Sequence, residues 1–392
     1  MLQKSNVSRW SEWVGDLSGK QVVKIDDQDA TITSRFSWAM FSGQPNARAF
    51  DYVLSLVSTW VSPEQVEVIP YTVKDVNPAY SWKNLVITFP GVSSPQETVF
   101  LTAHLDSIIV HDGDPMLLAP GADDNGSGAA VLLEAVRLFR SYQFEKTIKV
   151  VFFTGEEQFQ AGSSQFVATY ALGNPVGDIN LDMIGYNPSN NGQVQVHAGS
   201  SPEPNQLTDC LLLVNQAYQL NLVPQVISEN ASNRSDHVSF WSNRIPAIWL
   251  FDGFDQNGNV LNPNYHRPQD QLDALNPDYA LKISRLALAT TASLAVTRKE
   301  CAQRDINIRI ETTPAGNTLQ WDSAAGIDSY HVLRSTTGCS TGWRSMAVVN
   351  QSQWTDNEVQ NGVAYSYRVE AMDGAAAGFC TSVSQSCVQS TP

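Results

Sequence analysis

The amino-acid sequence predicts an α/β protein with a mixed, mostly parallel sheet flanked by helices, followed by a small all-β sandwich. Two short apolar runs, 99–103 and 146–153, are bounded by polar residues, as expected of strands buried on both faces. Helical patterns separate the strands along the chain, and this alternation favours a parallel sheet. Beyond Arg298, short alternating stretches lie between turn signals, which is typical of a β-sandwich. We therefore expect two domains, residues 1–300 and 301–392.

The elements of the first domain follow from the spacing of apolar residues. Apolar positions recur at helical spacing in five stretches, which we predict as helices: 47–61, 124–141, 163–171, 205–219 and 278–297. Apolar or β-branched runs that end at Pro, Gly or a polar residue are predicted as strands: 66–73, 84–89, 99–103, 146–153, 179–181 and 245–251. The order of these elements predicts a sheet that is covered by helices on both faces.

Composition excludes several classes of partner. The chain has 392 residues and a net charge of −15, which argues against nucleic acid and anionic membrane because both require clustered Lys and Arg. No apolar run is long enough to cross a bilayer, and the first ten residues lack the apolar core of a signal peptide. Two alternatives follow: a cytosolic protein, or a form whose leader is missing.

Cysteines cluster in the second domain, at positions 301, 339, 380 and 387. An even set of four in a small module favours disulfides and an oxidising compartment, whereas four buried free thiols are the alternative. Three pairings of Cys301, Cys339, Cys380 and Cys387 are possible. We therefore expect a secreted or periplasmic protein, whose leader is absent from this sequence.

Polar residues gather where the predicted buried strands end. His104 and Asp106 follow the first of these strands, Glu156 and Glu157 follow the second, and Asp182 ends the third. Ligands of open α/β sheets collect beyond the carboxyl ends of the strands, so these segments are expected to converge at one edge. Because Glu156 and Glu157 are adjacent, their side chains point apart, and one can bind metal while the other acts as general base. The residues alone leave open which glutamate does which.

A Gly-rich turn and a loop histidine add further ligands. Asp123 lies in the turn that enters the helix at 124–141, and Asp124 or Asn125 is expected to cap that helix. His266 lies in a loop, whereas His237 is expected to form a buried hydrogen-bonded pair with Asp236. Imidazoles and carboxylates together suit zinc or a similar divalent ion. Three carboxylates and two neutral imidazoles leave two dications with a net charge of about +1, so the sequence indicates a two-metal hydrolase.

In this order, these residues resemble the M28 family of zinc peptidases, in particular the bacterial secreted aminopeptidase branch. The resemblance covers residues 30–297 and rests on five motifs: His104-Leu105-Asp106-Ser107, Gly121 to Gly128, Thr154-Gly155-Glu156-Glu157, Leu181 to Gly185, and Tyr265-His266. The second domain resembles a fibronectin type III module, with Trp321 on an early strand and Tyr365 as the corner tyrosine of that fold.

The first resemblance implies two zinc ions as cofactors. Asp123 is expected to bridge the two ions, His104 and Asp182 to complete one site, and Glu157 and His266 to complete the other. The fold is then expected to be that of a zinc exopeptidase. Separately from the resemblance, we expect a monomer.

The same resemblance implies catalytic roles. Glu156 is expected to be the general acid/base, Asp106 to orient His104, and the Asp123–Asp124 peptide to be cis. Some secreted relatives carry a tyrosine just before the Ser-Asp-His segment, whose hydrogen bond acts in the transition state. This chain has Asn233 and Arg234 there, so either of them or neither fills that role.

The expected activity is that of a zinc-dependent aminopeptidase acting on the N-termini of peptides or proteins. A carboxypeptidase or dipeptidase is the first alternative, and it needs a cation for the substrate carboxylate: Arg234, Arg244 or Arg267. Structural ion pairing is the expected role of all three. A glutaminyl cyclase and a catalytically dead peptide-binding module are the further alternatives.

Overall fold

The structure of the chain is a computed structural model. It describes residues 2–37, 45–73, 80–170, 172–199, 206–296, 307–313, 316–323, 329–336, 338, 344–360, 362–373, 380–383 and 388–389. Contacts divide the chain into two compact units, one of residues 1–200 and 218–295, the other of 201–217 and 296–392. The predicted division places 201–217 in the first domain, and the domain boundaries stay a prediction. Within the described ranges, no helix is both long and apolar enough to cross a membrane.

The first unit is built on an eight-stranded sheet with the order β3-β4-β6-β5-β7-β10-β8-β9. Its strands are β3 (Val66–Val73), β4 (Tyr80–Phe89), β5 (Ser94–His104), β6 (Lys146–Phe153), β7 (Asn174–Leu181), β8 (Gln193–His197), β9 (Val223–Ile227) and β10 (Ala247–Phe251). The central strands β6, β5, β7 and β10 are parallel, as are β8 and β9. Antiparallel pairs join β3 to β4, β4 to β6 and β8 to β10, so the predicted mixed, mostly parallel sheet is confirmed.

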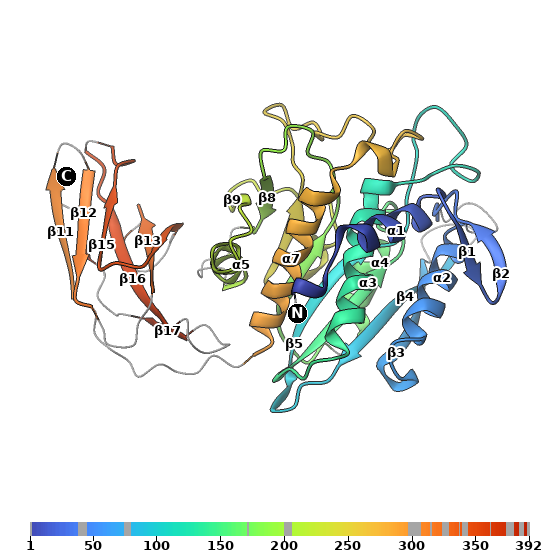
Figure 1. Cartoon of the computed structure of the whole chain (residues 1–392), viewed down its shortest axis with the longest axis horizontal. Coiled ribbons are helices and arrows are strands. Elements are labelled where there is room, and N and C mark those ends of the chain that lie inside the picture. Colours follow the sequence, from blue (N-terminus) through green and yellow to red (C-terminus); the bar gives the residue numbers. More distant parts are fainter. Residues whose placement is uncertain are drawn as a thin grey trace. The chain divides into compact units, whose positions relative to one another are not determined.

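Helices cover this sheet on both faces. The helices of the chain are α1 (Val7–Leu17), α2 (Asn46–Ser58), α3 (Gly128–Phe139), α4 (Ala161–Thr169), α5 (Gln206–Ala217), α6 (His237–Ser242) and α7 (Pro277–Leu294). Figure 1 shows α1, α3 and α7 running across one face of the sheet. On the opposite face, Phe166 of α4 and Phe240 of α6 pack against Phe100 of β5. Side chains alternate between the two faces of a strand, which explains why the central strands are apolar throughout.

Helix α1 was not predicted, although the sequence carries its signals. The Asn6 side chain accepts a hydrogen bond from the Arg9 amide at 2.9 Å and caps the helix. Trp10, Val14 and Leu17 recur at helical spacing, and all three are buried. A small hairpin follows it, made of β1 (Val22–Ile25) and β2 (Gln28–Thr31).

The second unit contains two antiparallel sheets that share one apolar core. The first sheet has the order β11-β12-β15, with β11 (Ile308–Thr313), β12 (Gly316–Trp321) and β15 (Gln353–Asp356). The second has the order β14-β13-β16-β17, with β14 (Arg344–Val349), β13 (Ser329–Ser335), β16 (Ser366–Asp373), β17 (Cys380–Val383) and, on β16, β18 (Val388–Gln389). Their common core contains Leu319 and Trp321 of one sheet and Val332 and Tyr367 of the other. The predicted additional β domain is therefore present.

Two predictions about the second unit remain predictions. The Gln360 amide donates to the Tyr365 hydroxyl at 3.1 Å, as expected of a corner tyrosine, but the likeness to a fibronectin type III module stays a prediction. Cys301, Cys339 and Cys387 lie outside the described residues, and Cys380 begins β17. The predicted disulfides are therefore not described.

Candidate metal centre

The candidate site lies at the carboxyl edge of three adjacent parallel strands. His104 is the last residue of β5, Glu156 and Glu157 follow β6, and Asp182 follows β7. Because β6, β5 and β7 are neighbours and run in the same direction, their ends bring these side chains together. The structure thus places these residues at one edge, as the sequence predicts.

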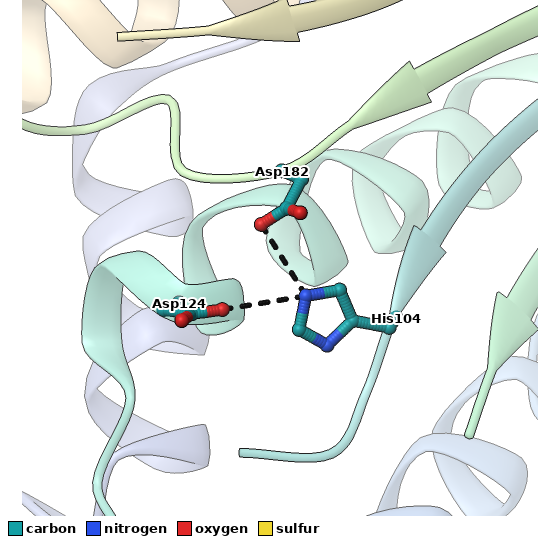
Figure 2. A group of neighbouring side chains, drawn as sticks. All are labelled: His104, Asp124 and Asp182. Atoms are coloured by element: carbon teal, nitrogen blue, oxygen red, sulfur yellow. Dashed lines mark hydrogen bonds and ion pairs between the residues drawn. The ribbon is translucent and has the colours of Figure 1, made fainter. Parts of the chain in front are cut away.

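One group of donors surrounds the imidazole of His104. Its Nε2 atom lies 3.3 Å from Asp124 Oδ1 and 3.3 Å from Asp182 Oδ1. Figure 2 shows the two carboxylates approaching the same ring nitrogen from different elements. All three residues are buried, and their ligand atoms lie close enough together to hold one metal ion.

A second group shares Asp124 with the first. Nε2 of His266 lies 3.1 Å from Asp124 Oδ2 and 3.0 Å from Glu157 Oε2. Asp124, Glu157 and His266 again form a set whose ligand atoms can hold one ion. The two oxygens of Asp124 thus face different histidines, and this residue belongs to both donor groups.

The structure corrects the prediction for Asp123. Its Oδ1 accepts the Gly185 amide at 2.8 Å, and its Oδ2 accepts the Asn262 side-chain amide at 2.7 Å. It also shares a hydrogen bond with Asp252, and burial is the main reason that its pKa rises to about 6. Adjacent side chains in this turn point in opposite directions, and Asp124 rather than Asp123 occupies the position between the histidines.

The turn that carries Asp124 spans Ala122–Ser127 in front of α3, and its backbone is kinked, with non-helical dihedrals at Asp124 and Asn125. Its cis peptide joins Asp124 to Asn125, one residue later than predicted. The N-cap position of α3 is Ser127, and the Oδ1 of Asn125 accepts the amide of Gly128, the first residue of the helix, at 3.0 Å. Asp270, which the sequence analysis did not single out, accepts the amides of both Asp123 and Asp124. These contacts fix the backbone beside the shared carboxylate.

Asp106 connects the loops after β5 and β6. Its two carboxylate oxygens accept the amides of Glu156 and Glu157, each at 3.2 Å. Nδ1 of His104 lies 3.1 Å from the backbone oxygen of Asp106 and 3.7 Å from its carboxylate. Asp106 therefore contacts His104 chiefly through its main chain, while its side chain holds the two glutamates in place.

Arg35 lies behind the site and is fully buried. Its guanidinium donates to the carbonyls of Leu105 at 2.7 Å, Leu17 at 2.6 Å and Gly121 at 2.8 Å, and also to that of Pro120. Burial lowers its pKa to about 10, which leaves the side chain charged at neutral pH. Arg35 thus joins α1, the loop after β5 and the turn that carries Asp124.

We expect Arg35→Met to destabilise the protein by about 3 kcal/mol or more, because several buried carbonyls lose their donor at about 1–3 kcal/mol each. Chemical denaturation measures this change in the free energy of unfolding. The control is Arg48→Met, at an exposed position of α2, which is expected to change stability by less than about 0.5 kcal/mol. Equal stability of the two variants would contradict the role of Arg35.

The charges of the cluster fit a divalent ion. Burial alone would lower the pKa of His266, but Glu157 and Asp124 raise it to about 11. Burial, with repulsion from Asp124, raises the pKa of Glu157 to about 7. Glu157 Oε1, which faces away from His266, is buried without a hydrogen-bond partner in the described part of the chain. Carboxylates crowded around imidazoles need positive charge, and this donor set is one that zinc prefers.

A cavity that is open to solvent lies over this cluster, with about 280 Å³ of empty space when the solvent at its mouth is included. Four carboxylates line one side of it: Asp124, Glu156, Glu157 and Asp182. Mostly apolar residues line the remainder: Met183, Arg234, Trp249, Phe251, Phe254, Val260 and Tyr265. A substrate can therefore place an apolar group against the aromatic wall while a polar group reaches the carboxylates.

Tyr265 and Arg234 form a contact inside this cavity. Arg234 Nη2 donates to the Tyr265 hydroxyl at 3.3 Å, and the guanidinium lies 5.2 Å from the centre of the Phe254 ring. The Tyr265 ring stacks on His266 with 3.7 Å between ring centres. Sequence reasoning missed Tyr265 as a separate functional residue, although its position next to His266 is a usable signal.

Three other predictions can be compared with the structure. His237 is buried, as predicted, but its Nε2 bonds to the carbonyl of Ser232 at 2.9 Å rather than to Asp236. Arg267 forms the expected ion pair, with Asp112 at 2.9 Å. Arg234 does not: within the described part of the chain it packs on aromatic rings and has no carboxylate partner.

Comparison with known proteins matches this chain to a peptidase family and to a probable aminopeptidase. The model of Peptidase family M28 matches residues 84–291, which is more than half of the chain. A probable leucine aminopeptidase of Trichophyton verrucosum is 27% identical over 298 residues, covering 73% of this chain and 76% of that protein.

Solved structures share the fold at low sequence identity. An aminopeptidase of Legionella pneumophila has a TM-score of 0.57 at 20% identity, covering 76% of this chain and 74% of that one. A glutaminyl cyclase of Porphyromonas gingivalis has a TM-score of 0.56 at 16% identity, covering 73% and 97%. The chain spans about half (50%) of the length of a zinc aminopeptidase of Bacillus subtilis, which is 23% identical with a TM-score of 0.46.

The fold, the donor groups and the matched relatives together define a hydrolase of the metallopeptidase class. The chain belongs to peptidase family M28.

Proposed function

We propose that this protein is a zinc-dependent aminopeptidase that removes N-terminal residues from peptides. The observation that carries the proposal is the position of Asp124, whose two oxygens face His104 and His266. Two three-residue groups that share one carboxylate fit two zinc ions. The match to a probable leucine aminopeptidase supports the choice of reaction.

In this proposal His104, Asp124 and Asp182 hold one zinc ion, while Asp124, Glu157 and His266 hold the other. When bound, the ions supply Lewis acidity that polarises a carbonyl group and lowers the pKa of water. The carboxylates of Asp124, Glu157 and Asp182 keep the net positive charge of the site small. Asp106 and Arg35 hold the loops that carry these ligands.

Glu156 is proposed as the general base. It lines the cavity but belongs to neither group of candidate ligands, which leaves its carboxylate available for proton transfer. It takes a proton from the attacking water and then delivers it to the nitrogen of the leaving amine. The Tyr265 hydroxyl accepts from Arg234, so its own proton is available to the oxygen of the substrate carbonyl.

The cavity also supports a preference for substrates. The free N-terminal amine of a substrate can donate hydrogen bonds on the polar side of the cavity, where the Glu156 carboxylate belongs to neither donor group. The side chain of the same residue then meets Trp249, Phe251 and Phe254. We therefore propose that apolar N-terminal residues are preferred.

The test compares the hydrolysis of leucine p-nitroanilide with that of its N-acetylated counterpart. We expect cleavage of only the free-amine substrate, loss of that activity after chelation and its recovery with zinc. Cleavage that survives complete chelation, or equal rates on the two substrates, would overturn the proposal.

A carboxypeptidase is the second candidate, because Arg234 lies in the cavity without a carboxylate partner among the described residues. Its guanidinium is suited to bind the free carboxylate of a substrate. N-acetylated peptides with a free carboxyl terminus distinguish the two activities: an aminopeptidase leaves them intact. We further propose that the protein is secreted and monomeric and that its second domain contains disulfides. The peptide-cleavage test does not address these three properties.

A further inference from the structure

The loop that follows Glu157 has an unusual backbone. Phe159 and Gln160 are successive residues in the left-handed region, with φ values of 62° and 53°. Neither is glycine, and such a conformation is uncommon for a bulky side chain. Backbone strain of this kind persists where the surrounding structure enforces it, and it gathers at functional sites. The surrounding structure therefore enforces a turn at this point of the loop.

The turn brings Gln160 back onto Glu156. The Gln160 amide donates to the Glu156 carbonyl at 2.8 Å, and the side-chain Nε2 donates to Glu156 Oε1 at 2.9 Å. At its other end, the Glu156 amide is held by Asp106. Within the described residues, the bond from Gln160 is the one side-chain hydrogen bond of the Glu156 carboxylate.

We propose that Gln160 is a positioning residue that orients the carboxylate of Glu156 for proton transfer. This inference rests on the proposed role of Glu156 as general base. The Gln160 Nε2 group is a donor only, so it occupies Oε1 both in the carboxylate and in the protonated acid. A proton taken from water is therefore held on Oε2, from which it passes to the leaving nitrogen. One oxygen is fixed so that the other carries the proton.

Helix α4 in turn supports Gln160. The Ser164 amide donates to the carbonyl of Gln160 at 2.9 Å, and the Ser163 hydroxyl does so at 3.2 Å. The N-terminus of the helix thus fixes the residue whose side chain reaches Glu156. A group that is itself held in place keeps a catalytic side chain within a narrow range of geometry.

The experiment uses two substitutions of Gln160. Asn tolerates the left-handed backbone and keeps an amide, but it is one methylene too short to reach Glu156. Met keeps the length and removes the donor. We expect Gln160→Asn and Gln160→Met to lower kcat about tenfold, equivalent to about 1.4 kcal/mol in activation free energy, with KM and zinc content within about twofold of wild type. The matched control is Gln165→Met, at an exposed position of α4, with unchanged kcat.

Crystal structures of the zinc-free proteins give a readout that is independent of activity. Glu156 is expected in one rotamer in the wild type and in more than one in Gln160→Asn. If both variants keep wild-type kcat while Glu156→Gln loses most of its turnover, Gln160 has no positioning role. A fall in kcat that follows loss of zinc or of folded protein also overturns the proposal. If Glu156→Gln itself keeps normal turnover, the general base is misassigned, and the proposed mechanism fails instead.

Discussion

Asp124→Asn is expected to lower the affinity for zinc by at least about 100-fold and to reduce hydrolysis to background. Asp124 is the residue common to both donor groups, with Oδ1 near His104 and Oδ2 near His266. Loss of a residue that only supports a metal ligand already costs about 10–100-fold in affinity, so loss of a shared anionic ligand costs more. Equilibrium dialysis with elemental analysis measures the zinc affinity and stoichiometry.

The adjacent aspartate provides a matched control. Asp123 faces the Gly185 amide and Asn262, away from both histidines, so Asp123→Asn is expected to keep its zinc affinity within about tenfold of wild type. The two substitutions change the same chemistry at neighbouring positions and differ in which way the side chain points. Zinc retained by Asp124→Asn and lost by Asp123→Asn would refute the assignment.

Glu156→Gln is expected to lower kcat by about 100- to 10,000-fold while two zinc ions remain bound. Glutamine keeps the size of the side chain and the oxygen that accepts from Gln160, but it cannot take a proton from water. Glu156 belongs to neither donor group, so metal binding is expected to stay intact. Steady-state kinetics beside zinc analysis separates the two effects. Near-normal kcat would remove Glu156 from its proposed role, and loss of zinc would make it a ligand.

Much of the fold follows from local patterns in the sequence. The apolar runs at 99–103 and 146–153 fall within β5 and β6, and the helical periodicity at 47–61 and 278–297 coincides with α2 and α7. Such patterns involve residues only a few positions apart, so they can be recognised in the sequence without the tertiary structure. Helix α1 can be recognised by the same reasoning, since Asn6 and the spacing of Trp10, Val14 and Leu17 are local signals.

Parts of the site depended on contacts that no local pattern contains. Asp270 lies 146 residues beyond Asp124 in the chain, and Arg35 lies 70 residues before Leu105, yet each holds the ligand loops through direct hydrogen bonds. Tyr265 and Arg234 meet over a shorter gap in sequence, of 31 residues, which is still too long for a local pattern. Hydrogen bonds between residues so far apart in the chain form only when the loops fold over the edge of the sheet.

The sequence by itself determined which segments supply the site. Polar residues lie at or just after the ends of three buried strands, and parallel strands bring their ends to one edge. Only the tertiary structure decided between Asp123 and Asp124. Both aspartates lie in the same turn, whose backbone amides are held by Asp270. Gly185 and Asn262 hold the carboxylate of Asp123 on the side away from the histidines. A shift of one residue in the chain is small, but in a turn it reverses the direction of a carboxylate.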